Sequence, residues 1–205
     1  MERDRPWGEP PPGRLAGAWH RIRGALGIGE RQTAETLPRL PLALRRGELA
    51  AAYLGAEADG DQRRAAAAAI AAADSAAARE DWWPADIWAH RALWHFEQAE
   101  MTLQAARAAR RIGEIRTLGG DPASARRYYA EAISEARDIG AEREEGLAAL
   151  GMGRAQLELG DVTTARRLAQ ISIDLLQRAG APPQDAEAAR QLRGVEKRVD
   201  TEGKR

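Results

Sequence analysis

The 205-residue chain contains no cysteine and has no net charge, because 31 basic residues balance 31 acidic ones. The absence of cysteine excludes disulfides, thiolate metal sites and a cysteine nucleophile. The balanced charge argues against a nucleic-acid-binding protein, which usually has a basic face. Asparagine is also missing, and only Lys197 and Lys204 supply lysine, so almost all positive charge is arginine. We interpret this arginine- and alanine-rich composition as bacterial, from a GC-rich genome.

Long apolar runs and strand-forming patterns are also absent. No stretch approaches the roughly 18 apolar residues of a membrane span, and residues 1–13 are too charged and Pro-rich for a signal peptide. We therefore expect a cytoplasmic protein. Valine, threonine, tyrosine and phenylalanine are scarce, whereas the abundant alanine, arginine, glutamate and leucine favour helix. The predicted fold class is all-α.

Four regions follow from the positions of proline, glycine and the apolar residues. They are a disordered segment (1–13), an amphipathic helix with a Pro-containing linker (14–41), a helical repeat domain (42–199) and a disordered tail (200–205). The amphipathic helix carries one apolar stripe, formed by Leu15, Trp19, Ile22 and Leu26. This stripe can cap the repeat domain, dock on a partner or lie on a membrane surface, although its charge is low for the last role.

Within the repeat domain, glycine, proline and aspartate separate the helical segments. We predict helices over 42–57, from Asp61 to about Arg79, and over 122–139, 142–159, 162–179 and 184–199. The region 85–118 has no proline and a single glycine. It is therefore either one long helix or two helices with a break near 97–104. Asp81 is a possible N-terminal cap.

A Gly-Asp pair recurs 40 residues apart, at Gly120-Asp121 and Gly160-Asp161. A glycine precedes each pair by seven residues, and an alanine follows its glycine by five. Small residues at these offsets let two antiparallel helices approach closely. The Gly-Asp pair supplies a tight turn, because glycine tolerates positive φ and aspartate caps the next helix. We therefore predict helical hairpins in which Gly113 faces Ala125 and Gly153 faces Ala165.

This pattern resembles the tetratricopeptide (TPR) family, in its roughly 40-residue-repeat form, over about residues 105–180. The family's order of small residue, Gly-Asp turn, alanine, aromatic and alanine is met by Gly113, Gly120-Asp121, Ala125, Tyr129 and Ala132, and again by Gly153, Gly160-Asp161, Ala165 and Ala169. A weaker copy around Gly60-Asp61 has Tyr53 in place of the small residue. The resemblance implies a short α-solenoid of stacked hairpins, with 184–199 as a capping helix.

The resemblance also implies that a peptide ligand lies along the inner helix of each hairpin. The groove-facing positions would be Arg107, Arg110, Glu114, Thr117 and Leu118 in one repeat, and Leu147, Leu150, Arg154, Leu157 and Glu158 in the next. The arginines can bind an acidic segment through paired hydrogen bonds. Alternatively, they pair locally with Glu114 and Glu158.

A tryptophan-rich segment is the second candidate binding surface. Its members are Trp82, Trp83, Trp88, Trp94 and Phe96. Such a helix is either packed on both sides within the solenoid or presents one side to a partner. Tryptophan is common among binding hot spots, which supports the second interpretation.

Motifs for chemistry are lacking. There is no nucleophile elbow and no phosphate-binding loop after a strand. Asp86, His90 and Glu97 share roughly one helix face but do not make a convincing metal site, and His95 is expected at a helix surface or interface. We expect no enzymatic activity, no metal and no cofactor.

The sequence therefore predicts a protein-interaction scaffold or adaptor that binds a protein or peptide partner. Two alternatives stay open. One is a bacterial regulator that contacts nucleic acid through the arginine-rich N-terminal segment, and the other is a structural subunit that assembles with itself.

Overall fold

The computed structural model describes residues 39–194, which are all-α and contain no strand. The predicted fold class is therefore confirmed for this part of the chain. The helices are the 3₁₀ turn η1 (Leu42–Leu44), α2 (Glu48–Ala58), α3 (Gln62–Ala77), α4 (Trp82–Gln98), α5 (Thr102–Leu118), α6 (Pro122–Asp138), α7 (Glu142–Glu158), α8 (Val162–Arg178) and α9 (Pro183–Gly194). None of them is long and apolar enough to cross a membrane. The N-terminal helix and the two disordered segments predicted from the sequence lie outside the described residues.

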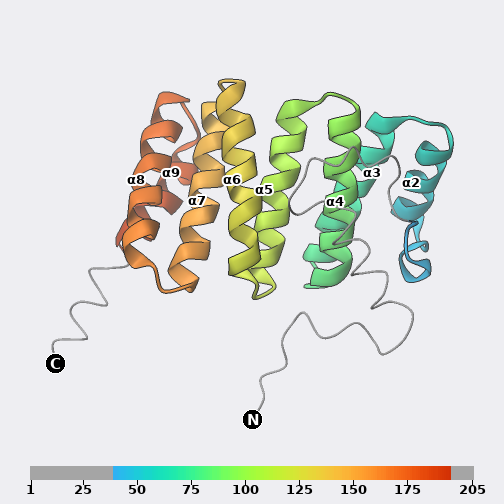
Figure 1. Cartoon of the computed structure of the whole chain (residues 1–205), viewed down its shortest axis with the longest axis horizontal. Helices are drawn as coiled ribbons and strands as arrows, with labels where there is room; N and C mark the ends of the chain where they lie inside the picture. Colours follow the sequence, from blue (N-terminus) through green and yellow to red (C-terminus); the bar gives the residue numbers. More distant parts are fainter. Residues whose placement is uncertain (1–38, 195–205) are drawn as a thin grey trace, which may run out of the picture. The chain divides into compact units, whose positions relative to one another are not determined.

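The chain divides into two compact units, one ending at Ala99 and the other beginning at Glu100. The sequence had predicted a single repeat domain over 42–199. The division falls inside the predicted break near 97–104, so the region 85–118 forms two helices, α4 and α5. Figure 1 shows the antiparallel helices of each unit, with α2–α4 in blue to green and α5–α9 in green to red.

Consecutive helices start at a strict interval of 20 residues, at Gln62, Trp82, Thr102, Pro122, Glu142 and Val162. Each intervening turn places one residue at positive φ, which ends the preceding helix. In the turn after α5, Gly120 has φ 83° and the Asp121 amide donates to the Arg116 carbonyl at 2.8 Å. Glycine occupies most of these positions, but Glu80 and Glu100 occupy two of them.

Three of the four aspartates predicted to cap helix N-termini do so, and Asp81 does not. The carboxylates of Asp61, Asp121 and Asp161 accept from the backbone N–H three residues on, as an N-terminal cap does. Asp81 precedes α4 but makes no such bond, because its carboxylate pairs with Arg79 Nε at 3.1 Å.

Helix boundaries differ from the sequence prediction at both ends of the described region. The predicted helix over 42–57 is a 3₁₀ turn followed by α2, which begins only at Glu48 because Gly47 adopts φ 94°. The closing helix begins at Pro183, and its description ends at Gly194.

In the first unit, α3 packs between α2 and α4. The buried residues of α3 are all alanine, at positions 65, 66, 69, 72, 73 and 76. Because alanine is small, helix backbones can approach closely along this face. The bulky side chains of the unit therefore come from α2 and α4.

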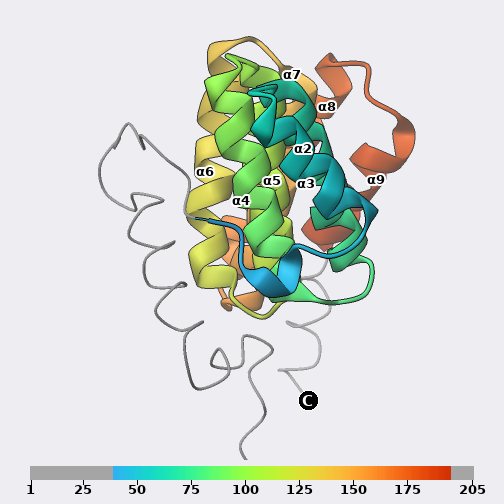
Figure 2. The same cartoon turned by 90° about the vertical axis from the view of Figure 1, so that its right-hand side faces the viewer.

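In the second unit, α5 pairs with α6 and α7 pairs with α8, and α9 packs on α7 and α8. Figure 2 shows α9 turned back beside these two helices. Leu150, Ile173 and Leu192 join the three helices in one apolar cluster. The sequence prediction of a capping helix is thus met by α9, which lies at the end of the stack.

Candidate functional site

The tryptophan-rich segment lies mostly inside the first unit. Trp88 is 5% exposed and Phe96 is 8% exposed, and the Trp88 ring meets the Tyr53 ring edge-on with centroids 5.2 Å apart. Trp82, Trp83 and Trp94 are half-buried. Trp88 and Phe96 therefore offer little surface to a partner, which corrects the sequence interpretation for these two residues.

Beside Trp88, the Tyr53 hydroxyl lies at the centre of a buried polar network. It lies 3.0 Å from Glu57 Oε1, 3.0 Å from His95 Nε2 and 2.8 Å from an Arg91 nitrogen. The Gln62 amide contacts the other ring nitrogen of His95. An Arg91 N–H donates to the hydroxyl. Gln62 Oε1 accepts from His95 Nδ1, so Nε2 of the neutral ring accepts from the hydroxyl.

This network keeps His95 neutral. Burial, helped by the nearby Arg91 charge, lowers the pKa of His95 to about 4. Burial also raises the pKa of Tyr53 to about 12. The side chain of His95 is 2% exposed, so it does not lie at a surface, but at the contact of α4 with α2 and α3. The network is structural, because it fixes α2 and α3 to α4.

The residues considered for a metal are split between interior and surface. Asp86 and His90 are buried, with His90 Nδ1 2.7 Å from the Asp86 carbonyl oxygen. Glu97, in contrast, is exposed. The three residues therefore have different surroundings although they share a helix.

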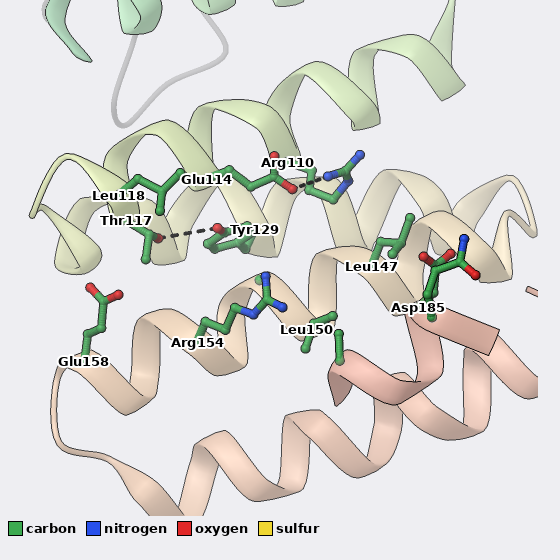
Figure 3. Close-up of a pocket in the computed structure, with 13 residues that line it drawn as sticks. Arg110, Glu114, Thr117, Leu118, Tyr129, Leu147, Leu150, Arg154, Glu158 and Asp185 are labelled. Carbon is green, nitrogen blue, oxygen red and sulfur yellow. Dashed lines mark hydrogen bonds and ion pairs between the residues drawn. The ribbon is translucent and has the colours of Figure 1, made fainter. Parts of the chain in front are cut away.

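A groove lies in the second unit, on the inner helices α5 and α7 and the N-terminal half of α9 (Figure 3). Its volume is about 410 Å³, which is in the range of about 300–1,000 Å³ typical of ligand sites. The lining residues are Arg110, Glu114, Thr117, Leu118, Tyr129, Leu147, Leu150, Gly151, Arg154, Glu158, Gln184, Asp185 and Ala188.

Tyr129 forms the floor of the groove and is held between two helices by glycines. A Cβ on Gly113 of α5 would lie 2.8 Å from the Tyr129 ring, and a Cβ on Gly151 of α7 would overlap the same ring. The Tyr129 hydroxyl lies 3.4 Å from Thr117 Oγ1. Burial raises the pKa of Tyr129, so its hydroxyl stays protonated. The ring therefore fills the space that the two glycines leave.

The sequence predicted that Gly113 faces Ala125, but the atoms nearest to an added Cβ on Gly113 belong to the Tyr129 ring. For Gly153, a Cβ would lie 3.3 Å from the Ala165 carbonyl oxygen, as the predicted approach to Ala165 requires. It would also lie 2.8 Å from Leu192 of α9. These glycines therefore set the spacing between the helices that shape the groove.

A charge network joins α5 to α7 at one end of the groove. Glu144 is 4% exposed and accepts from both Arg107 and Arg110. Arg110 also pairs with Glu114. Burial opposes the charge of Arg110, but Glu114 and Glu144 outweigh it and raise its pKa. Both arginines are therefore ion-paired, Arg110 in a half-buried position and Arg107 at the surface.

Arg154 and Glu158 differ from these paired residues. Both are exposed, and neither forms a hydrogen bond or ion pair with another described residue. Figure 3 shows them one after the other on α7, across from Thr117 and Leu118 of α5. Partial burial raises the pKa of Glu158. The groove thus offers one cation and one anion to a ligand.

Most residues that the sequence assigned to the groove do line it. Arg107 and Leu157 do not line the groove. Leu157 packs instead against the apolar cluster that contains Leu150 and Leu192. The residues that sequence reasoning missed are Tyr129, Gly151, Gln184, Asp185 and Ala188. Tyr129 of α6 and the three residues of α9 lie outside the two inner helices, so the spacing along one repeat carries no signal for them. Gly151 lies on α7, next to the predicted Leu150.

The fold and the groove define an all-α protein built from stacked antiparallel helical hairpins, with a polar and apolar groove along its inner helices. No model of a known protein family and no curated protein matches the chain in sequence.

Proposed function

We propose that this protein is a non-catalytic interaction module of the tetratricopeptide type, which binds a segment of a partner protein in the groove of its second unit. The observation that carries this proposal is that Arg154 has no ion pair within residues 39–194, whereas the other arginine of the lining, Arg110, is ion-paired. A cation left without a partner in a groove favours an anionic group on a ligand.

Apolar surface next to Arg154 supports the same function. Leu118 is 63% exposed at the groove, although it is a large hydrophobic residue. Leu147 is half-buried and lies on the same side of α7 as Arg154 (Figure 3). Covering such side chains contributes about 25 cal/mol per Å² of apolar surface. A partner with an apolar residue beside a carboxylate therefore complements the groove.

Affinity capture from the source organism tests this function. The full chain is compared with Arg154→Glu and with Arg126→Glu, a control that reverses an exposed arginine of α6 outside the groove lining. We expect Arg154→Glu to lose a captured protein that the parent and the control both retain. Capture of the same proteins by all three chains contradicts the proposal.

A third variant separates the groove from the tryptophan-rich segment. Trp82→Ala with Trp83→Ala removes two half-buried side chains, whereas replacing Trp88 would disturb the interior. Loss of the partner by this double variant, with retention by Arg154→Glu, would assign binding to the first unit instead.

A further inference from the structure

Few polar groups of the groove are available to a ligand, because most of them bond to other groups of the protein. Thr117 Oγ1 donates to the Gly113 carbonyl, and Asp185 pairs with Arg143. Tyr129, Arg110 and Glu114 are also engaged within the protein. Among the lining residues, this leaves Arg154, Glu158 and Gln184 without a hydrogen bond or ion pair to any other described residue.

These remaining groups are poorly suited to an extended segment. An extended chain presents an N–H and a C=O at every residue, and each needs a partner when it is removed from water. Side-chain amides can satisfy both at once, but the chain contains no asparagine and Gln184 is the only glutamine in the lining. The backbones of α5 and α7 are occupied by their own helical bonds. An extended ligand would therefore find few partners for its backbone groups on the side that faces the groove.

A helical ligand avoids this cost, because its backbone bonds are internal. It needs only side-chain partners, which are the kind that the groove supplies. Arg154 and Glu158 are four residues apart on α7, which is roughly 6 Å along the axis at 1.5 Å per residue. Opposite charges on neighbouring turns of a docked helix have the same spacing.

We propose that the groove binds an amphipathic α-helix of a partner protein, whose acidic and basic residues, one turn apart, pair with Arg154 and Glu158. Apolar residues on the same face of this helix cover Leu118 and Leu147. This inference rests on the proposed function and adds the secondary structure and charge pattern of the ligand.

Two display libraries of equal peptide length test the inference on the full chain. The first library randomises one face of an alanine-based helix, and the second fixes two internal prolines so that its peptides cannot be helical. Selected peptides are then measured against the parent, Arg154→Glu, and the exchanged variant Arg154→Glu with Glu158→Arg. Because both side chains are exposed, these variants should fold, which circular dichroism checks.

We expect groove-dependent peptides to come from the helical library and to bind Arg154→Glu about tenfold more weakly than the parent. Reversing the two charges of a selected peptide should restore its binding to the exchanged variant. The inference is overturned if the groove-dependent peptides come from the proline library, or if charge reversal changes nothing. If Arg154→Glu weakens no peptide from either library, the proposed function itself fails.

Discussion

At the scale of single residues, contacts with glycine shape the second unit. Gly113, Gly146, Gly151 and Gly153 lie inside helices, where glycine costs about 1 kcal/mol relative to alanine. At each of them an added Cβ would come within 3 Å of a bulky side chain. At Gly146, for example, Leu176 Cγ would lie at 2.9 Å. The cost in helix propensity is therefore offset by close packing.

Gly151→Ala should lower the free energy of unfolding by about 1–3 kcal/mol, because overpacking outweighs the gain in helix propensity. The Tyr129 ring cannot move away, since Gly113 holds its other side. Urea denaturation followed by circular dichroism measures the change. In the control Gly55→Ala, no atom lies within 4 Å of the new methyl group. That variant should gain about 0.5–1 kcal/mol, and equal effects at both sites would disprove the packing argument.

His95 should make stability depend on pH. Its pKa is about 4 in the folded protein and roughly 6.5 in the unfolded chain. The unfolded chain therefore takes up a proton first as pH falls, so stability is full above about pH 6.5 and decreases down to about pH 4. The total decrease in the free energy of unfolding over this pH range is about 3 kcal/mol. Unfolding free energies between these pH values should have a smaller slope in His95→Gln, and an unchanged slope would exclude His95 as the cause.

At the scale of elements, the helical hairpins depend on turns that place one residue at positive φ. Glycine adopts this conformation without strain, whereas a residue with a Cβ does not. Glu80, between α3 and α4, has φ 60°. This turn keeps the 20-residue interval between helix starts despite the unfavourable residue.

Glu80→Gly should raise the free energy of unfolding by about 0.5–1 kcal/mol, because it removes the strain of a left-handed non-glycine residue. The reverse change, Gly140→Ala, places a methyl group at φ 67° in open space, so only backbone strain acts there. It should cost a similar amount. Thermal unfolding of both variants checks the pair, and a loss of stability in Glu80→Gly would show that the glutamate side chain contributes more than its strain costs.

At the scale of the whole molecule, the groove is a property of one unit. All of its lining residues, and the Glu144 network beside it, belong to α5–α9. The apolar cluster that joins α7, α8 and α9 also lies within this unit.

Residues 100–205 produced alone should therefore fold into a helical protein that unfolds cooperatively. Circular dichroism with thermal denaturation tests this. Any ligand selected on the full chain should bind the fragment with similar affinity. An unfolded fragment, or a folded one that no longer binds, would show that the first unit is required.

The sequence by itself determined the helical class and most of the groove. Composition excluded strands, and the spacing of glycine and aspartate located the turns at Gly120 and Gly160. The resemblance then placed Arg110, Leu150 and Arg154 on one side of the inner helices. The 3.6-residue turn fixes which residues share a helix face, but which face is the inner one came from the resemblance alone.

Only the tertiary structure decided which of these residues remain available to a ligand. Glu144 lies far from Arg110 in sequence but forms an ion pair with it, whereas Arg154 has no such partner in the part of the chain that the structure describes. The turns at Glu80 and Glu100 have no glycine at the positive-φ position, so the 20-residue interval between Gly120, Gly140 and Gly160 could not be followed back through them in the sequence. The burial of Trp88 likewise depends on Tyr53 of another helix. Pairing and burial arise from contacts between distant segments, which local spacing does not encode.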